Sequence, residues 1–404
     1  MVRWARASGQ QVTAQTTGHN ASPLGPLQNT ILLKTERMRQ ISIDPVARTA
    51  RVEAGVIWIE VLEAAAPHGL APLSGSSPNV GVAGYVLGGG ISFLGRKYGL
   101  SANHVRAIEL VTADGQLVRA DREHEQDLFW ALRGGGGSFG VVTSIEVELL
   151  PVKQVCAGIL WYPVERESEV LHTWRNLTQD ERLPDDLTTI GRFLNFPSFP
   201  ELPEEIRGKA FVVVEAIHVG DPAQADELLA PLRELGPVDD TVATIPMPAL
   251  AHLHMDPDQP APGVADGLLL REMPEAALDT FVHVAGQNTK LPLFSVEVRH
   301  LGGAFTRPDP RHGALSSIQA KYLMRAVEML PAPELEPATR AHVESLKAAF
   351  SPWTAREMNL NFAETQRDPQ SFWTHEAYDR LRRIKATADP GNIIRSNHPI
   401  PPAR

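Results

Sequence analysis

GSSPNVGVAGYVLGGGISFLG, residues 75–95, is the stretch of sequence that decides the fold. Seven of its residues are glycine, and most of the others are small or apolar. Glycine allows close approach of a backbone to another surface and adopts positive φ without strain, so this stretch predicts a loop moulded to a large ligand. Composition alone fits a turn-rich connection between buried strands equally well. The flanking sequence has to decide between the two.

Length and composition describe an ordinary globular chain. With 404 residues, 43% of them hydrophobic, we expect two domains and a full core. The net charge of −10 argues against a nucleic-acid partner, and no apolar run approaches a membrane span. One cysteine, Cys156, excludes an internal disulfide and a cysteine metal site, and we expect it to be buried. The start, MVRWARASGQQ, is not a signal peptide, so the default location is the cytoplasm.

Short strands and two helices flank the glycine stretch. Apolar residues at helical spacing predict a helix that ends before Pro67 and Gly69, and Asp114-Gly115 predicts a hairpin turn. A second glycine cluster occupies 134–137. The predicted strands are 11–15, 30–33, 49–54, 107–112, 117–120 and 140–149, and the predicted helices are 56–66 and 128–132.

Five motifs follow one another along this part of the chain. They are TGHN from Thr17, GSSPNVGVAGYVLGGG from Gly75, RKYGLSANHV from Arg96, VTADG from Val111 and DLFWALRGGGGSFGVVT from Asp127. As a set they resemble the berberine-bridge-enzyme-like flavoproteins, FAD-linked oxidases with the vanillyl-alcohol-oxidase type of FAD domain. The resemblance covers 12–152 and returns at MNLNFAE, 358–364, and at DPGNIIRSNHPI from Asp389. Between these parts only RHLGGAF, 299–305, is similar.

The resemblance implies an α+β fold. A two-subdomain FAD-binding domain would be joined to a substrate domain built on an antiparallel sheet with helices on one face. Its expected parts are 1–152, the N-terminal part of the FAD domain, 153–356, the substrate domain, and 357–404, a C-terminal segment that returns to the FAD domain. Relatives carry a further strand and helix upstream, and 1–9 resembles the end of that helix. A truncated start, and with it a lost export signal, is therefore left open.

The cofactor implied by the resemblance is FAD, whose pyrophosphate and ring edges need closely placed N–H donors. In the family the histidine after the glycine turn, here His19, is attached to the flavin 8α-methyl. The second attachment uses a cysteine whose place is taken by Ser77, which lacks a thiolate, so we predict a monocovalent flavin through His19. The predicted cofactor-binding residues are Gly18, His19, Asn20, Gly75, Ser76, Ser77, Asn79, Val80, Gly81, Gly84, Tyr85, Gly88, Gly140, Val142, Asn361 and Asn397.

The residue that removes a proton is less clear. Asn359 stands where much of the family has a tyrosine base, and an amide cannot act as a base near neutral pH. The replacement candidates are Glu297, His300 and Tyr85, with Glu364 also open, and substrates that lose hydride without a base would fit as well. Alternation within FSVEVRH places Ser295, Glu297 and Arg299 on one face of a strand, where they line an active site or meet solvent.

The rest of the chain predicts a sheet with helices. We expect strands at 188–194, 209–217 and 294–300, and helices from 221 and at 317–330, 339–350 and 375–388. The proline-rich stretch 236–267 predicts a loop or lid. We expect His252 and His254 within it to be solvated rather than metal-bound, and we predict no metal site.

These observations favour an FAD-dependent oxidoreductase that passes hydride from a C–H next to oxygen or nitrogen of a small sugar, alcohol or secondary metabolite to the flavin. Val80 occupies the position at which relatives with a small branched residue admit oxygen, which favours O2 as acceptor. The alternative is a flavin- or ligand-binding protein that has lost activity, motivated by Asn359 and the missing upstream strand. No G-x-G-x-x-G opens a helix after the first strand, which excludes a Rossmann dehydrogenase.

Overall fold

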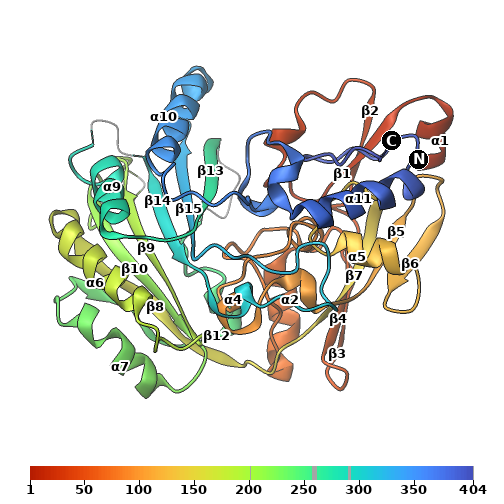
Figure 1. The fold of residues 1–404 in the computed structure, drawn as a ribbon. Coiled ribbons are helices and arrows are strands. Elements are labelled where there is room, and N and C mark those ends of the chain that lie inside the picture. The colour runs from red at the N-terminus through yellow and green to blue at the C-terminus, as the bar shows by residue number, and fades with distance from the viewer. Residues whose placement is uncertain (201, 257–261, 290–292, 404) are drawn as a thin grey trace.

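The computed structural model describes residues 1–200, 202–256, 262–289 and 293–403, which form two halves, each built on an antiparallel sheet (Figure 1). The half on the right of Figure 1 holds both chain ends, and the half on the left is made from the middle of the sequence. The predicted α+β class is confirmed, with antiparallel sheets in both halves.

The first half is organised around a five-stranded sheet of order β3-β4-β7-β5-β6. Its strands are β3 Ile41–Asp44, β4 Thr49–Glu53, β5 Val105–Val111, β6 Leu117–Asp121 and β7 Val141–Glu148. A separate parallel pair joins β1 Gln11–Gln15 to β2 Thr30–Lys34. The helices of this half are α1 Val2–Ala7, α2 Trp58–Ala65, α3 Val82–Leu87, α4 Gly95–Tyr98, α5 Gln126–Leu132 and α11 His375–Ala388. The glycine stretch is therefore not all loop, because α3 lies inside it.

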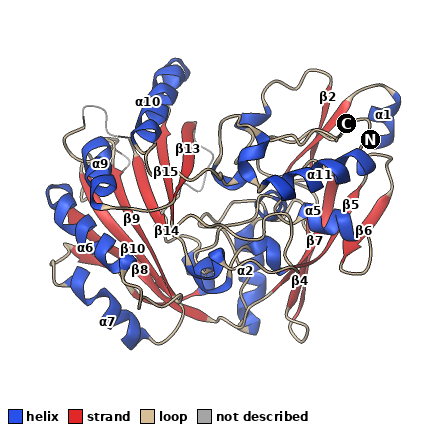
Figure 2. Cartoon of the chain, viewed as in Figure 1, coloured by secondary structure: helices blue, strands red, loops and turns tan. Residues whose placement is uncertain are grey.

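The second half is an eight-stranded sheet of order β11-β8-β10-β9-β14-β15-β13, with β12 also paired to β8. Its strands are β8 Gln154–Pro163, β9 Leu187–Asn195, β10 Ala210–His218, β11 Asp239–Asp240, β12 Ala243–Pro246, β13 Gly263–Leu270, β14 Ser295–His300 and β15 Tyr322–Met329. The helices are α6 Glu167–Gln179, α7 Pro222–Arg233, α8 Met247–Leu250, α9 Glu275–Ala285 and α10 Glu336–Ala349. Helices α6, α7, α9 and α10 cover the outer face (Figure 2).

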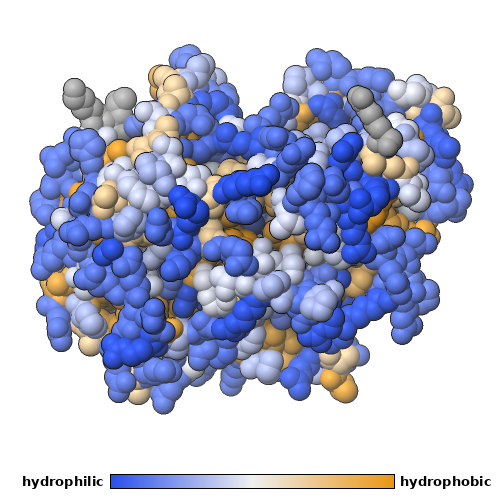
Figure 3. Space-filling model, viewed as in Figure 1, coloured by the Kyte–Doolittle hydropathy of each residue, from blue (hydrophilic) through white to orange (hydrophobic). Residues whose placement is uncertain are grey.

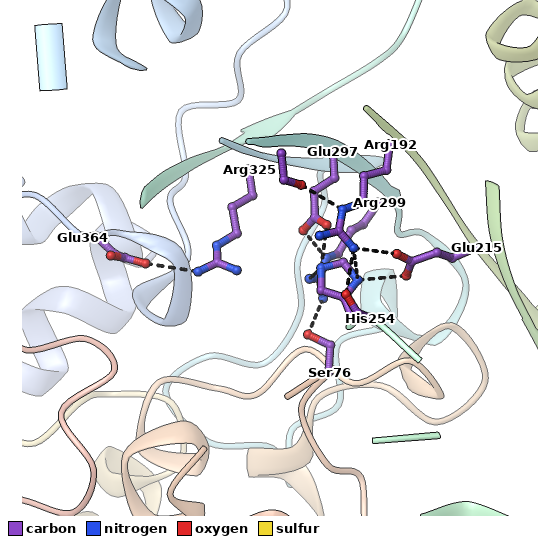
Figure 4. A network of polar contacts seen from close by, with 9 residues as sticks. Ser76, Arg192, Glu215, His254, Glu297, Arg299, Arg325 and Glu364 are labelled. Carbon is purple, nitrogen blue, oxygen red and sulfur yellow. Dashed lines mark hydrogen bonds and ion pairs between the residues drawn. The ribbon is translucent and has the colours of Figure 1, made fainter. Parts of the chain in front are cut away.

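Alternation along β14 decides what each face of this sheet meets. Val296 and Val298 pack into the core beneath the outer helices. Ser295, Glu297 and Arg299 point the other way, as the sequence predicts: Arg192 Nε donates to the Ser295 hydroxyl at 2.8 Å, and Figure 4 shows Glu297 and Arg299 beside Arg192. They are buried, which excludes the alternative that this face of the strand meets solvent. The inner face of the sheet therefore carries polar groups toward the first half.

The helix predicted at 317–330 is wrong, because this segment contains β15. Its residues Lys321 to Leu330 are mostly good helix formers, which favours a helix by propensity. Pairing with β14 on one side and β13 on the other overrides that preference. Tyr322, Met324 and Ala326 enter the helix-covered core, and Arg325, between Met324 and Ala326, points to the inner face.

The loop predicted at 236–267 is also largely wrong. Strands β11 and β12 pair with β8, α8 follows, and β13 begins at Gly263. What remains without regular structure is short, and 257–261 lie outside the described residues. His252 is exposed, as predicted, but His254 is only 2% exposed, so the expectation that it is solvated is wrong. Cys156 is buried, as predicted.

The end of the chain packs back onto the first half. Ile394 forms a parallel bridge with Val12 of β1, and the buried Lys385 ammonium donates hydrogen bonds to the carbonyls of Ser138 and Ile394. Figure 1 shows this segment, in blue, beside β1 and α5. We propose on this basis that the domain boundaries lie near 152 and 357.

The visible surface is mainly hydrophilic on the face drawn in Figure 3, with a notch between the halves at its upper edge. None of the described helices combines the length and apolar character needed to span a lipid bilayer.

Candidate functional site

A long cavity runs between the halves and brings together segments that are far apart in sequence. Its walls come from 13–21, from the glycine stretch, from the second glycine cluster and from the C-terminal segment. Asp256 and Arg325 close it on the side of the second half. Every residue predicted to bind the cofactor lines this cavity except Asn79.

Three glycines keep the cavity open. A Cβ atom added to Gly84, in α3, would meet no atom within 4 Å. At Gly136 and Gly137 the nearest atoms would be Leu360 Cδ1 at 3.7 Å and Ser396 Cβ at 3.6 Å. Because these residues line the cavity, a side chain at any of them would project into space that the backbone now borders.

Asn361 fixes the glycine stretch from the C-terminal segment. Its Oδ1 accepts the Gly90 N–H at 2.9 Å, and its Nδ2 donates to the Tyr85 carbonyl at 3.1 Å. Gly88 has no room for a side chain there, because a Cβ atom would lie 2.4 Å from Asn361 Nδ2. Asn359 in turn accepts the Asn361 N–H through its Oδ1 at 3.0 Å. The amide at the family's tyrosine position thus holds the turn that presents Asn361.

His19 faces the cavity and is held by Asn79. Burial lowers the pKa of the imidazole, and a hydrogen bond with Asn79 opposes that change. Asn79 also accepts a hydrogen bond from the Ser77 hydroxyl at 2.9 Å. His19 is therefore neutral at pH 7, with a ring nitrogen lone pair free of a proton. Asn79 is placed to orient His19.

The three predicted catalytic residues lie in different places. Tyr85 lines the cavity, but burial raises the pKa of its phenol, so it is protonated near neutral pH. His300 lies away from the cavity, with its Nε2 3.1 Å from Arg96 Nη1, and burial and Arg96 hold its pKa well below the ordinary value. Glu297 is buried beside Arg299 and does not line the cavity. The geometry brings only Tyr85 to the cavity.

Glu297 belongs to a buried network of five charged side chains (Figure 4). His254 Nδ1 lies 2.9 Å from Glu215 Oε2, and its Nε2 lies 2.9 Å from Glu297 Oε2. Arg192 Nη1 donates to Glu215 at 2.9 Å, and Arg299 Nε donates to Glu297 at 2.7 Å. These five residues, all at most 4% exposed, form what we call the His254 network.

The His254 network reaches the glycine stretch directly. Arg299 Nη1 donates to the Ser76 hydroxyl at 3.2 Å, and Ser76 lines the cavity. Burial and Arg192 oppose protonation of His254, but Glu215 and Glu297 outweigh them and raise its pKa. Burial alone would raise the pKa of Glu297, yet Arg299 and His254 hold it well below the usual range. These shifts favour the charged forms of His254 and Glu297, and the network ties the second sheet to the glycine stretch.

Two further charged residues, Arg325 and Glu364, lie inside the cavity. Arg325 Nη2 lies 3.3 Å from Glu364 Oε1. Burial raises the pKa of Glu364, Arg325 opposes this, and Asp266 adds to it. Neither Arg325 nor Asp256 is a predicted site residue, because the Arg325 segment favours a helix by propensity and no sequence pattern marks Asp256. YLMRAVEM is apolar at both sets of alternate positions, so no period of two marks Arg325 in the sequence.

Metal chemistry has no support in the described part of the chain. No group of three His, Cys, Asp or Glu side chains there is arranged to hold a metal ion. His254, the residue closest to such a pattern in the sequence, is instead held between two carboxylates and faces two guanidinium groups.

Known proteins place this architecture in a family. The family model described as "FAD binding domain" matches residues 1–121, and the family model described as "Berberine and berberine like" matches residues 358–401. (R)-6-hydroxynicotine oxidase of Paenarthrobacter nicotinovorans is 30% identical over 99% of this chain and 88% of that protein. The chain belongs to the berberine-bridge-enzyme-like family of FAD-linked oxidoreductases. As a member of this family it is an FAD-dependent enzyme.

Three further proteins are similar to this chain in sequence or in fold. An uncharacterised FAD-linked oxidoreductase of Bacillus subtilis, YgaK, is 28% identical over all of this chain and 88% of its own length. Berberine bridge enzyme from Eschscholzia californica has the same fold, with a TM-score of 0.84 and 20% identity over 100% of this chain and 87% of its own. Phl p 4.0202, a glucose dehydrogenase, has the same fold with a TM-score of 0.82. It is 22% identical over 100% of this chain and 88% of its own.

The cavity fits FAD by its own features. Open glycine backbone at Gly84, Gly136 and Gly137 admits a large flat ligand, whereas ordinary side chains would not. Asn20 Oδ1 is buried without a hydrogen-bond partner among the described residues, and it lines the cavity as an acceptor for a ligand hydroxyl. Residues from all four chain segments would therefore hold the cofactor.

Replacing Gly84 with leucine should block the cavity without unfolding the protein. Gly84 lies in α3 and its φ is not positive, so leucine suits the helix, but its side chain would fill cofactor space. We expect the affinity for FAD to fall by about tenfold or more while the melting temperature of the apoprotein is kept. Fluorescence titration of apoprotein with FAD measures this. G391L, at an exposed glycine, is the control; equal affinity in G84L and wild type would contradict the assignment.

Removing His254 should destabilise the protein strongly. H254A leaves two buried carboxylates without their shared partner, a loss that costs about 3–5 kcal/mol for buried pairs. H252A, two residues earlier and exposed, should change the free energy of unfolding by about 0.5 kcal/mol or less. Urea unfolding of both variants makes the comparison. Similar values for the two would show that the His254 network does not stabilise the fold.

The effect of H254A should also depend on pH. Because folding raises the pKa of His254, its contribution is fully present below its unfolded pKa of about 6.5 and is lost as pH rises through the folded value. Folding lowers the pKa values of Glu215 and Glu297, so their contributions to stability have the opposite pH dependence and are lost in acid. The difference between wild type and H254A should therefore shrink at alkaline pH. A difference that grows with pH would contradict a protonated His254.

Proposed function

We propose that the protein is an FAD-dependent oxidase of a small organic molecule, with Glu364 as its catalytic base. The observation that carries this proposal is that one cavity holds both the glycine cradle and a carboxyl group of raised pKa. When bound, FAD supplies a two-electron acceptor for hydride from a C–H next to oxygen or nitrogen, and O2 takes the electrons to give hydrogen peroxide.

Glu364 suits the role of base better than the residues predicted from sequence. A carboxylate with a raised pKa takes up a proton more readily than an ordinary one, while it remains ionised near neutral pH when a cation is adjacent. Arg325 provides that cation. Tyr85 is protonated near neutral pH, and Glu297 and His300 do not line the cavity. Glu364 therefore accepts the O–H or N–H proton of the substrate.

Oxygen as the electron acceptor is supported by Val80 and by one relative. Val80 lines the cavity beside Gly81 at the start of α3, where a small side chain leaves room for O2. The relative that is 30% identical is an oxidase by name, whereas Phl p 4.0202 is a dehydrogenase, so both acceptor types occur in this fold. Oxidase activity is measured as peroxide formed per substrate consumed.

Covalent attachment through His19 is supported by its protonation state. Only a neutral imidazole has a ring nitrogen free to bond to carbon, and burial keeps His19 neutral. The hydrogen bond with Asn79 fixes the ring at the cavity wall. Ser77 offers only a hydroxyl, so a second bond is not expected.

His19→Ala should therefore give protein whose flavin is released by acid. Wild-type protein should remain fluorescent under ultraviolet light on a denaturing gel, and H19A should not, although FAD still binds to the rest of the cavity. His68→Ala, at an exposed histidine outside the cavity, is the control. A fluorescent H19A band would place the bond elsewhere. Flavin that wild type releases in acid would exclude a covalent link altogether.

Glu364→Gln should lower the rate of flavin reduction by about a hundredfold or more. In wild type the rate should rise with pH as the Glu364 carboxyl ionises, and this acid limb should be absent in E364Q. Anaerobic bleaching by the best compound from a panel of alcohols, sugars and amines provides the measurement, and E357Q, at an exposed glutamate, is the control. If the acid limb of the pH–rate profile is the same in E364Q as in wild type, Glu364 is excluded as the catalytic base. Failure of every compound to bleach a fully loaded protein would favour a binding protein without turnover.

A further inference from the structure

Arg325 lines the cavity and has hydrogen-bonding capacity to spare. A guanidinium has five N–H donors. Among the described residues, only Glu364 accepts a hydrogen bond from Arg325, and at 3.3 Å that bond is long for a charge-assisted pair. Figure 4 shows the guanidinium between Glu364 and the His254 network, with a single contact. Its side chain is 23% exposed, and this exposure is toward the cavity it lines.

Neighbouring arginines show that this is unusual here. Arg192 donates to Glu215, to the Ser295 hydroxyl and to the His254 carbonyl. Arg299 donates to Glu297 and Ser76. Both are at most 4% exposed. Arg325 is therefore the member of this group that is left to bind something else.

We propose that Arg325 and Glu364 together form a subsite for a hydroxyl group, with Glu364 accepting the O–H hydrogen and Arg325 donating to the oxygen. This subsite selects a neutral ligand that carries a hydroxyl group, and it disfavours ligands that carry an ammonium group. The inference rests on the proposed function only in that this hydroxyl would be the group oxidised. Binding itself needs no reaction.

The matching of donors and acceptors favours a hydroxyl over an amine. A hydroxyl offers one hydrogen and two lone pairs, which is the complement of a carboxylate beside a guanidinium. An ammonium has no lone pair to accept from Arg325, and it would face like charge at close range. A neutral amine could accept, but its single lone pair would then be held by Arg325. Asp256, on the same wall, adds negative charge. An ammonium group would bind beside Asp256 rather than beside Arg325.

Apolar surface next to the subsite accommodates the body of such a molecule. Phe362 lines the cavity, and the Arg325 guanidinium lies 5.8 Å from the centre of its ring. Leu87 and Ile91 of the glycine stretch line the same cavity. The ring also holds the guanidinium in place through a cation–π contact. The ligand class is thus a compact alcohol with an apolar body.

Two isosteric probes test the subsite without turnover. 2-Phenylpropan-2-ol has no hydrogen on its carbinol carbon and so cannot be oxidised there, and 2-phenylpropan-2-amine replaces the hydroxyl by an ammonium. Each is titrated into FAD-loaded protein, and binding is followed by the change in flavin absorbance. We expect the alcohol to bind roughly tenfold more tightly than the amine, because a hydrogen bond to a charged group contributes at least that factor.

Variants connect the preference to the two residues. R325M should weaken binding of the alcohol by roughly tenfold or more and remove the preference over the amine. R325K, which keeps the charge but loses the planar fork, should fall between R325M and wild type and serves if R325M does not fold. R182M, at an exposed arginine that pairs with Asp180 outside the cavity, should bind as wild type does.

Several results would overturn the subsite. Equal or tighter binding of the amine in wild type would assign this wall to a cation held by Asp256 and Glu364. No spectral change with the alcohol at any concentration, or unchanged affinity in R325M, would remove Arg325 from recognition. Loss of FAD from R325M and R325K would make Arg325 a cofactor contact. None of these results depends on turnover, so they are independent of whether the proposed oxidase activity is found.

Discussion

The structure depends on holding a stretch of backbone that has almost no side chains between two sheets. Such a stretch gains little from its own packing, and each glycine has a large entropic cost on ordering. It is therefore fixed from outside. Asn361 bonds it from the C-terminal segment, and Arg299 reaches Ser76 from the second sheet. Both halves of the protein contribute to the shape of one loop.

The glycines of this stretch serve two purposes. Gly84 borders open cavity, so its missing side chain leaves room for the cofactor. Gly95 is different, because a Cβ atom there would lie 1.9 Å from Phe305 Cζ of the second half. The same composition thus provides ligand space at one end and close contact between the halves at the other. Sequence alone gives no means of telling the two kinds apart.

Local sequence predicted most of the first half well. Strand β1 and helix α11 have the predicted bounds, since Thr17-Gly18 follows the first and Asp389-Pro390 ends the second. Sequence failed where pairing between distant strands decides the structure. The segment that became β15 has helical propensity, and only its two neighbours make it a strand.

The candidate site was predictable to the same extent. Motifs placed nearly all cofactor-binding residues at the cavity, because those residues act through backbone and short side chains whose positions follow from local spacing. The charged groups opposite them were not found. Arg325 and Asp256 reach the cavity through the register of the second sheet and through the contact that seats His254. Neither depends on neighbours in sequence.

The buried charges of the second half are costly to assemble. With His254 protonated, three cations face two carboxylates in the His254 network, all removed from water. An apolar core would be equally stable or more so. What the charges supply is orientation, because each guanidinium and the imidazole have one geometry that satisfies all partners. The glycine stretch is thereby placed at a defined position against β14, with Ser76 as the point of contact.

The return of the C-terminal segment to β1 has a consequence for the order in which the molecule is made. The cofactor cavity needs Leu360 to Phe362 and Ile394 to Asn397 together with Thr13 to Asn20, and the whole second half is synthesised between these segments. During that time the glycine stretch lacks its hydrogen bonds to Asn361. FAD can therefore find a finished cavity only after Asn397 has been synthesised, so cofactor loading follows synthesis of the second half.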